Sequence, residues 1–133
     1  MSATIDGRAE ELLKGKNFAN VATLRRDGSV QVAPVWVDVQ GGQAVVNSAK
    51  GRAWPTNLER DPRVTVSVQN MENPYEYVEI RGRVVEQTTE GADEHINSLA
   101  KKYLGQDEYP YRQPGEQRVI IRIEPEHVHL TAA

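Results

Sequence analysis

The chain has 133 residues, of which 38% are hydrophobic and 26% charged, and its formal net charge is −3. This length suits one domain over residues 1–133, which would bury roughly two thirds of the unfolded-chain surface. The negative charge argues against a general binder of nucleic acids or anionic membranes. Because cysteine is absent, disulfides, thiol nucleophiles and thiolate metal sites are excluded. Without an apolar N-terminal segment or an apolar run of about 18 residues, we expect a cytoplasmic protein.

The first part of the chain predicts a short helix followed by a β-hairpin. Residues 5–14 suit a helix. Residues 18–24 then alternate, and Arg26-Asp27-Gly28-Ser29 is a hairpin turn of the Asp-Gly type. The returning strand is predicted over 30–39, and the parity of its apolar residues changes around Pro34. That change indicates a bulge or an edge position.

The rest of the chain continues this pattern of short strands and adds two helices. Gly41-Gly42 predicts a turn, and Gly82 inside a strand predicts a bulge or a close backbone approach. A helix beginning at Thr88 or Thr89 and ending at Leu104 has one apolar face, and His95 on it is expected to be exposed. The other predicted elements are strand 44–47, helix 55–60, strand 64–68, strand 75–85, loop 106–117 and strand 118–123 followed by 127–130.

These elements predict a mainly β fold. They amount to six or seven mostly antiparallel strands with two or three peripheral helices. A small closed or nearly closed β-barrel suits such a series, because closure removes exposed strand edges.

A basic turn between a strand and the helix at 55–60 is the strongest candidate site. Lys50 and Arg52 flank Gly51, which would let the backbone approach a phosphate closely. The first N–H groups of a helix lack intrahelical partners and lie at the positive end of its dipole. The turn therefore indicates an anion site, although a solvated basic loop between strands would have the same residues.

Four segments occur in an order that resembles a known superfamily. They are TLRRDGSVQVAPVW (23–36), NSAKGRAWPTNLERDPRVTVSV (47–68), YVEIRGRVVE (77–86) and VIIRIEPEHV (119–128). The chain resembles the pyridoxamine-phosphate-oxidase-like split β-barrel superfamily, and within it the actinobacterial-type enzymes that use the deazaflavin coenzyme F420. The resemblance covers nearly the whole chain. Its most specific parts are the T-x-x-x-D-G…P-V-W hairpin and the G-R-A…N-L-x-R-D-P-R-V segment.

The resemblance implies a homodimer with two cofactor sites, each at the subunit interface. It implies that the phosphate end of the cofactor lies near Lys50 and Arg52 and that the ring lies along residues 32–36. It assigns no catalytic residue and no metal. The implied cofactor-binding residues are Val32, Ala33, Pro34, Val35, Trp36, Asn47, Ser48, Ala49, Lys50, Gly51, Arg52, Ala53, Trp54, Asn57 and Tyr77.

Trp54 departs from the family pattern, since many relatives carry a phosphate-binding lysine there. Lys50 and Arg52 would replace that lysine, or the phosphate would be held less tightly. Trp54 itself would stack on the ring, cover a polyglutamate tail or have an exposed packing role. We interpret Trp36, the other tryptophan, as barrel core.

Tyrosine and histidine pairs offer weaker candidates. Tyr75 and Tyr77 share a strand face, and Tyr109 and Tyr111 lie in a proline-bounded loop. Either pair would roof a site across the interface or pack at the surface. The pair of histidines at 127 and 129 shares a strand face but has no evident third ligand, so we predict no metal site.

Three functions remain open at this stage. The first is a reductase that moves a hydride from reduced F420 to a small unsaturated or conjugated acceptor. The second is an FMN-dependent oxidoreductase on the same barrel, which Trp54 disfavours because a dianionic phosphate needs several donors. The third is a non-catalytic cofactor or tetrapyrrole carrier. No nucleophile elbow, H-E-x-x-H or G-x-G-x-x-G occurs, which agrees with chemistry supplied by a cofactor.

Overall fold

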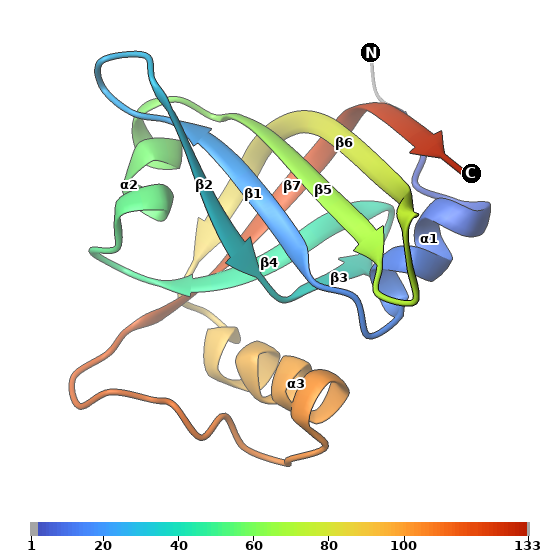
Figure 1. Ribbon diagram of the computed structural model, residues 1–133. Helices are drawn as coiled ribbons and strands as arrows, with labels where there is room; N and C mark the ends of the chain where they lie inside the picture. Colours follow the sequence, from blue (N-terminus) through green and yellow to red (C-terminus); the bar gives the residue numbers. More distant parts are fainter. Residues whose placement is uncertain (1–2, 133) are drawn as a thin grey trace.

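A computed structural model describes residues 3–132, which form three helices and one seven-stranded antiparallel sheet (Figure 1). The strand order in the sheet is β2-β1-β5-β6-β7-β4-β3. The elements are α1 (Gly7–Lys14), β1 (Ala19–Leu24), β2 (Val30–Val35), β3 (Val37–Gln40), β4 (Gln43–Ala49), α2 (Ala53–Arg60), β5 (Arg63–Asn70), β6 (Asn73–Thr88), α3 (Ala92–Leu104) and β7 (Arg118–Thr131). The mainly β prediction is confirmed, and the sheet curls into a half-barrel.

The chain between residues 30 and 40 forms two strands, so the prediction of one strand over 30–39 is wrong. β2 pairs with β1 at one edge of the sheet, and β3 pairs with β4 at the other. Trp36 is the only residue between them, so the two edges approach each other there. The parity change near Pro34 therefore marks an edge strand that leaves its sheet, as barrel-like curling requires.

The two longest strands, β6 and β7, pair along most of their length and bend together. Residues 118–131 form one strand, where the sequence predicted two shorter ones. The pairing shifts between Arg81 and Gly82 and again between Val84 and Glu86. A Cβ on Gly82 would overlap the carbonyl oxygen of Glu124. The prediction of a close backbone approach at Gly82 is confirmed, and these bulges allow the long strands to curl.

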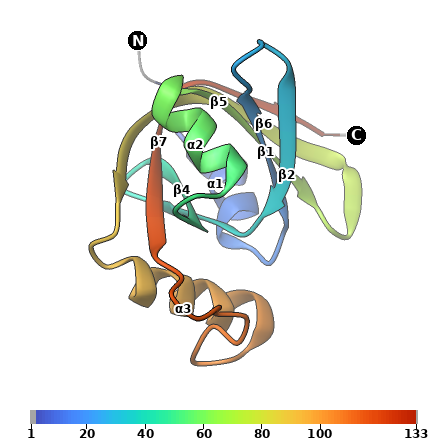
Figure 2. The ribbon, with the colours of Figure 1, turned by 90° about the vertical axis from the view of Figure 1, so that its left-hand side faces the viewer.

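The hydrophobic core lies inside the curled sheet and is closed by a helix at each end. Alternate residues of the strands point inward, and burying each valine stabilises the fold by roughly 1.5–3 kcal/mol relative to exposure. α1 and α2 lie at opposite ends of the half-barrel (Figures 1 and 2). Core residues from strands and helices include Val21, Val37, Val46, Val66, Val68, Ile80, Ile121, Leu12, Leu13, Trp54 and Leu58.

Helix α3 packs outside the sheet, below β4 and β7 in Figure 1. It begins at Ala92, later than the predicted start at Thr88 or Thr89, because β6 continues to Thr88. Its N-cap residue is Gly91, which has no side chain to form a cap. The Tyr103 hydroxyl donates to the Asn17 carbonyl oxygen (2.6 Å) and accepts from the Val37 N–H (3.1 Å). These bonds hold α3 against the point where β3 begins.

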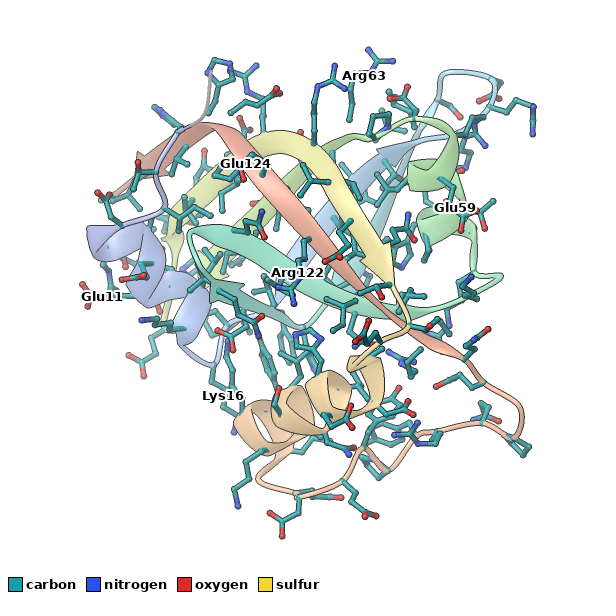
Figure 3. All side chains as sticks on the ribbon, turned by 180° about the vertical axis from the view of Figure 1, so that it is seen from behind. Glu11, Lys16, Glu59, Arg63, Arg122 and Glu124 are labelled. Carbon is teal, nitrogen blue, oxygen red and sulfur yellow. The ribbon has the colours of Figure 1, made fainter. Side chains whose placement is uncertain are left out.

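Charged side chains lie on several elements around the surface, for example Glu11 on α1, Glu59 on α2 and Arg63 on β5 (Figure 3). None of the helices within residues 3–132 has the length and apolar character needed to cross a membrane.

Candidate functional site

A cavity of about 260 Å³ lies beside the gap that opens between β2 and β4 where the chain leaves the sheet at Trp36. β3 pairs with β4 only as far as Val46, so within residues 3–132 the last three residues of β4 have no neighbouring strand on that side. The start of α2, one side of α3 and the start of β7 complete the walls. The lining residues are Phe18, Pro34, Val35, Trp36, Asn47, Ser48, Arg52, Trp54, Ile96, Leu99, Tyr109, Tyr111 and Arg118.

The cavity brings together part of the predicted cofactor set. The predicted residues that line it are Pro34, Val35, Trp36, Asn47, Ser48, Arg52 and Trp54. They come from the end of β2 with Trp36, from β4, and from the start of α2 with the preceding Arg52. Their role in binding a cofactor stays a prediction.

The other predicted cofactor residues do not line the cavity. Val32 and Tyr77 are exposed on β2 and β6, with exposed fractions of 61% and 37%. Asn57 is buried, and its amide donates to Thr23 Oγ1 and Gln31 Oε1, both at 3.0 Å, so it fastens α2 to the hairpin. The remaining ones are Lys50, Gly51 and Ala53, which are exposed, Ala33, which packs against the core, and Ala49, which is buried.

One wall of the cavity is aromatic. Trp36 stacks on Tyr103 with ring centroids 5.2 Å apart, and Tyr109 meets Trp36 edge-on at 5.9 Å. Tyr111 in turn meets Tyr109 edge-on at 5.7 Å. Trp36 therefore packs between the sheet and α3, and the prediction that it is barrel core is wrong, because the chain turns out of the sheet there. Planar rings of this kind suit a flat conjugated ligand.

Trp54 belongs both to the core and to the cavity. Its exposed fraction is 7%, so the prediction of an exposed packing role is wrong. It follows the N-cap residue Arg52 by two positions, and the first turn of α2 directs it inward among core residues. A lysine at this place would be largely buried, which costs free energy unless an anion is bound beside it.

The basic turn has the backbone that the sequence predicted, but its two cations differ. Gly51 has a φ of +90°, which a side chain would strain. The Arg52 guanidinium lies 3.3 Å from a Glu116 carboxylate oxygen and lines the cavity. Lys50 is exposed, and its backbone N–H donates to the Gln117 carbonyl oxygen at 2.9 Å. Of the two cations, Arg52 is therefore the one at the cavity.

Sequence reasoning missed a buried polar network that starts at Arg118. Arg118 has an exposed fraction of 4% and donates from Nε to Asn47 Oδ1 and from Nη1 to Glu116 Oε1, both at 2.9 Å. The Tyr109 ring covers its guanidinium at 5.0 Å. The only sequence signal was parity, since Arg118 shares a strand face with the buried Ile120.

His95 continues this network from α3. The amide nitrogen of Asn47 lies 3.0 Å from both the Ala92 carbonyl oxygen and His95 Nδ1. Because the Asn47 oxygen accepts from Arg118, its nitrogen donates, so His95 Nδ1 accepts and the proton is on Nε2. Burial lowers the pKa of His95 to about 4. His95 is therefore neutral and buried, and the prediction that it is exposed is wrong.

Residues 5–132 match the family described as Pyridoxamine 5'-phosphate oxidase. The chain belongs to this family, and both the predicted superfamily and the split-barrel fold are confirmed. The described residues contain no group of three or more potential metal ligands among His, Asp and Glu.

Several solved structures share the fold. An F420 reductase is 29% identical, with a TM-score of 0.79 over 90% of this chain and 94% of that one. A conserved hypothetical protein from Mycobacterium tuberculosis is 18% identical, with a TM-score of 0.74 over 98% and 86% of the two chains. General Stress Protein 26 from Bacillus anthracis is 18% identical, with a TM-score of 0.65 over 91% and 88%. No curated protein matches the chain in sequence. The family supports an oxidoreductase on a flavin-binding type of fold.

Proposed function

We propose that the protein transfers a hydride between reduced coenzyme F420 and a small unsaturated or conjugated organic acceptor at this cavity. The observation that carries the proposal is the pairing of an aromatic wall with cations in one cavity, where Trp36 and Tyr109 lie near Arg52. The similarity to an F420 reductase over most of both chains supports the choice of cofactor.

The residues present fit such a cofactor. β2 is an edge strand, so its backbone N–H and C=O groups that do not pair with β1 are available to the polar edge of a planar ring. The basic turn and Arg52 suit its phosphodiester. When bound, the deazaflavin supplies the hydride, and the chain binds and orients the reacting partners.

The cavity also limits which groups can supply a proton. Tyr75 and Tyr77 are not among its lining residues, so neither phenol is placed to act as an acid there. Tyr111 lines it and has an exposed fraction of 58%, so the entrance is open to solvent. Water can therefore protonate the reduced acceptor without a dedicated acid.

The proposal includes a homodimer with one site at each side of the interface. The cavity of one chain, about 260 Å³, is smaller than the roughly 300–1,000 Å³ of most sites for cofactor-sized ligands. Val30 and Val32 lie on one side of β2 and have exposed fractions of 56% and 61%. A second subunit over this side of β2 would enlarge the site and cover these side chains.

FMN is the second candidate cofactor, and one observation favours it. Arg118 adds a second guanidinium to the cavity beside Arg52. Two arginines would supply the several donors that a dianionic phosphate needs, which weakens the earlier argument from Trp54.

Titration of the full chain with F420 and with FMN tests the proposal, with tryptophan fluorescence as the readout, because both tryptophans line the cavity. We expect saturable binding of F420 in the micromolar range and weaker binding of FMN. Reduced F420 with a simple conjugated enone should then be oxidised only when the protein is present. Preference for FMN would move the protein to the flavin branch, and binding without turnover of any acceptor would support a carrier.

A further inference from the structure

A cluster of three charged side chains borders the cavity, and its charges do not balance. Glu116 and Arg118 are buried, whereas the Arg52 side chain is 49% exposed. Glu116, whose side chain is 5% exposed, accepts from Arg118 at 2.9 Å and from Arg52 at 3.3 Å. Two guanidinium groups therefore share one carboxylate, and both arginines line the cavity. A partly buried cluster with one excess positive charge is stabilised by an anion beside it.

Arg118 is held in position before any ligand arrives. Its Nε donates to Asn47 and its Nη1 donates to Glu116, so neither of these two bonds uses Nη2. Tyr109 covers the guanidinium plane at 5.0 Å, which restricts its rotation. A planar fork fixed in this way loses little entropy when it binds a carboxylate or a phosphate.

A second, independent observation concerns Ser48 on the neighbouring strand. Ser48 lines the cavity and is 1% exposed, yet its hydroxyl has no hydrogen-bond partner among the described residues. A buried hydroxyl without a partner is destabilising, and such groups usually have a functional explanation. An oxyanion in the cavity would accept from a hydroxyl at this place.

We propose that Arg118, supported by Arg52 and Ser48, forms an oxyanion-binding subsite that selects ligands carrying a phosphate or a carboxylate next to a planar conjugated group. The aromatic wall of Trp36 and Tyr109 takes the planar part. This inference rests on the proposed function, because it concerns the same cavity. It adds that a ligand bound there is anionic. The anion comes either from the cofactor, as a phosphate, or from the acceptor, as a carboxylate.

Two matched ligand pairs separate these sources by equilibrium binding alone. FMN and riboflavin differ by a phosphate, and cinnamate and cinnamamide differ by the charge of a small conjugated acceptor. We expect the wild-type chain to bind the anionic member of at least one pair about 10-fold or more tightly, as charge-assisted hydrogen bonds predict. Preference in the first pair assigns the subsite to the cofactor, and preference in the second assigns it to the acceptor.

Variants then test whether Arg118 carries this preference. Arg118→Gln should reduce the preference to about twofold or less while leaving the affinity for the neutral member nearly unchanged. Glu116→Gln removes the shared carboxylate and should strengthen anion binding about threefold or more. Arg63→Gln, which removes an exposed cation on β5, is the control and should keep the wild-type preference. Circular dichroism and thermal unfolding would establish that each variant is folded.

Three results would overturn the proposal. They are equal binding of both members in both pairs, no binding of any probe up to about 10 mM, and a folded Arg118→Gln chain that keeps its preference. If Arg118→Gln does not fold, Glu116→Gln decides, and unchanged anion affinity in that variant counts against the subsite. None of these binding measurements uses F420 or depends on turnover. The anion subsite can therefore be confirmed or rejected independently of the proposed hydride transfer.

Discussion

The side chain of Asn47 joins three elements through one amide group. Its oxygen accepts from Arg118 on β7, and its nitrogen donates to the Ala92 carbonyl and to His95 on α3. Each of these groups is buried, so the loss of one partner would leave another unsatisfied, at a cost of roughly 1–3 kcal/mol. The polar side of the cavity is therefore held by side chains from three elements.

His95 makes the stability of the protein depend on pH between its usual pKa of about 6.5 and its folded value of about 4. In this range the unfolded chain binds more protons than the folded one, so the free energy of unfolding falls as the pH falls. From about pH 7 to pH 5 the loss should be about 2 kcal/mol. Urea unfolding at several pH values measures it.

Two variants separate this effect from other titrating groups. His95→Gln should lose much less stability over the same pH range, because no buried imidazole remains to be protonated. His127→Gln, which changes an exposed histidine on β7, should keep the full wild-type loss. Equal losses in the wild type and in His95→Gln would contradict the assignment.

The basic turn should contribute to cofactor affinity mainly through Arg52. The combined change Lys50→Ala and Arg52→Ala should weaken cofactor binding by about 1–3 kcal/mol, as expected for lost charge-assisted hydrogen bonds. Arg52→Ala alone should account for most of it, since only Arg52 of this pair lines the cavity. Fluorescence titration measures both, with Lys101→Ala on α3 as control. Unchanged affinity in the double variant would remove the turn from the site.

At the scale of elements, the bulged pairing of β6 with β7 sets the curvature of the half-barrel. Gly82→Ala should lower the free energy of unfolding by about 3 kcal/mol or more, because the new Cβ would overlap the Glu124 carbonyl group and force the strands apart. Val85→Ala on the same strand changes an exposed side chain and should cost less than about 1 kcal/mol. Chemical unfolding of both variants tests the difference, and similar values would mean that the strands adjust easily.

Helix α3 forms the wall of the cavity that the half-barrel itself does not supply. It brings Ile96 and Leu99 to the lining, and the loop that follows it brings Tyr109 and Tyr111. Its attachment combines the apolar packing of Tyr103 with polar contacts, since the Lys102 Nζ donates to the Leu13 and Val37 carbonyl oxygens, both at 2.6 Å. The position of the aromatic wall therefore depends on contacts far from it in sequence.

At the scale of the whole molecule, the proposed homodimer should depend on the exposed face of β2. Val32→Glu places a charge where we expect an apolar interface, so the dimer should dissociate and cofactor affinity should fall at least about tenfold. Analytical ultracentrifugation and fluorescence titration measure the two effects together. Val85→Glu, also at an exposed valine, should remain a dimer. A wild-type chain that sediments as a monomer while binding cofactor fully would contradict the proposal.

Local patterns in the chain were sufficient for most elements. The Asp-Gly turn, the alternation over 64–68 and the apolar face of α3 each predicted a feature that the structure confirms. His95 had a local signal too, since it stands four residues before Leu99 on the buried face of α3. These patterns succeed because hydrogen bonding and alternation involve neighbouring residues.

Pairing between distant strands determined the rest. No local pattern shows that the chain crosses at Trp36 from one edge of the sheet to the other, or that Arg118 comes to lie beside Asn47. The basic turn at residues 50–52 had a local signal, and the family resemblance supplied residues 32–36, whereas Tyr109 and Arg118 reach the cavity only through the packing of α3 and β7. Backbone preferences and apolar periodicity depend on a few adjacent residues, but a cavity depends on which surfaces meet when the whole chain minimises its exposed apolar area.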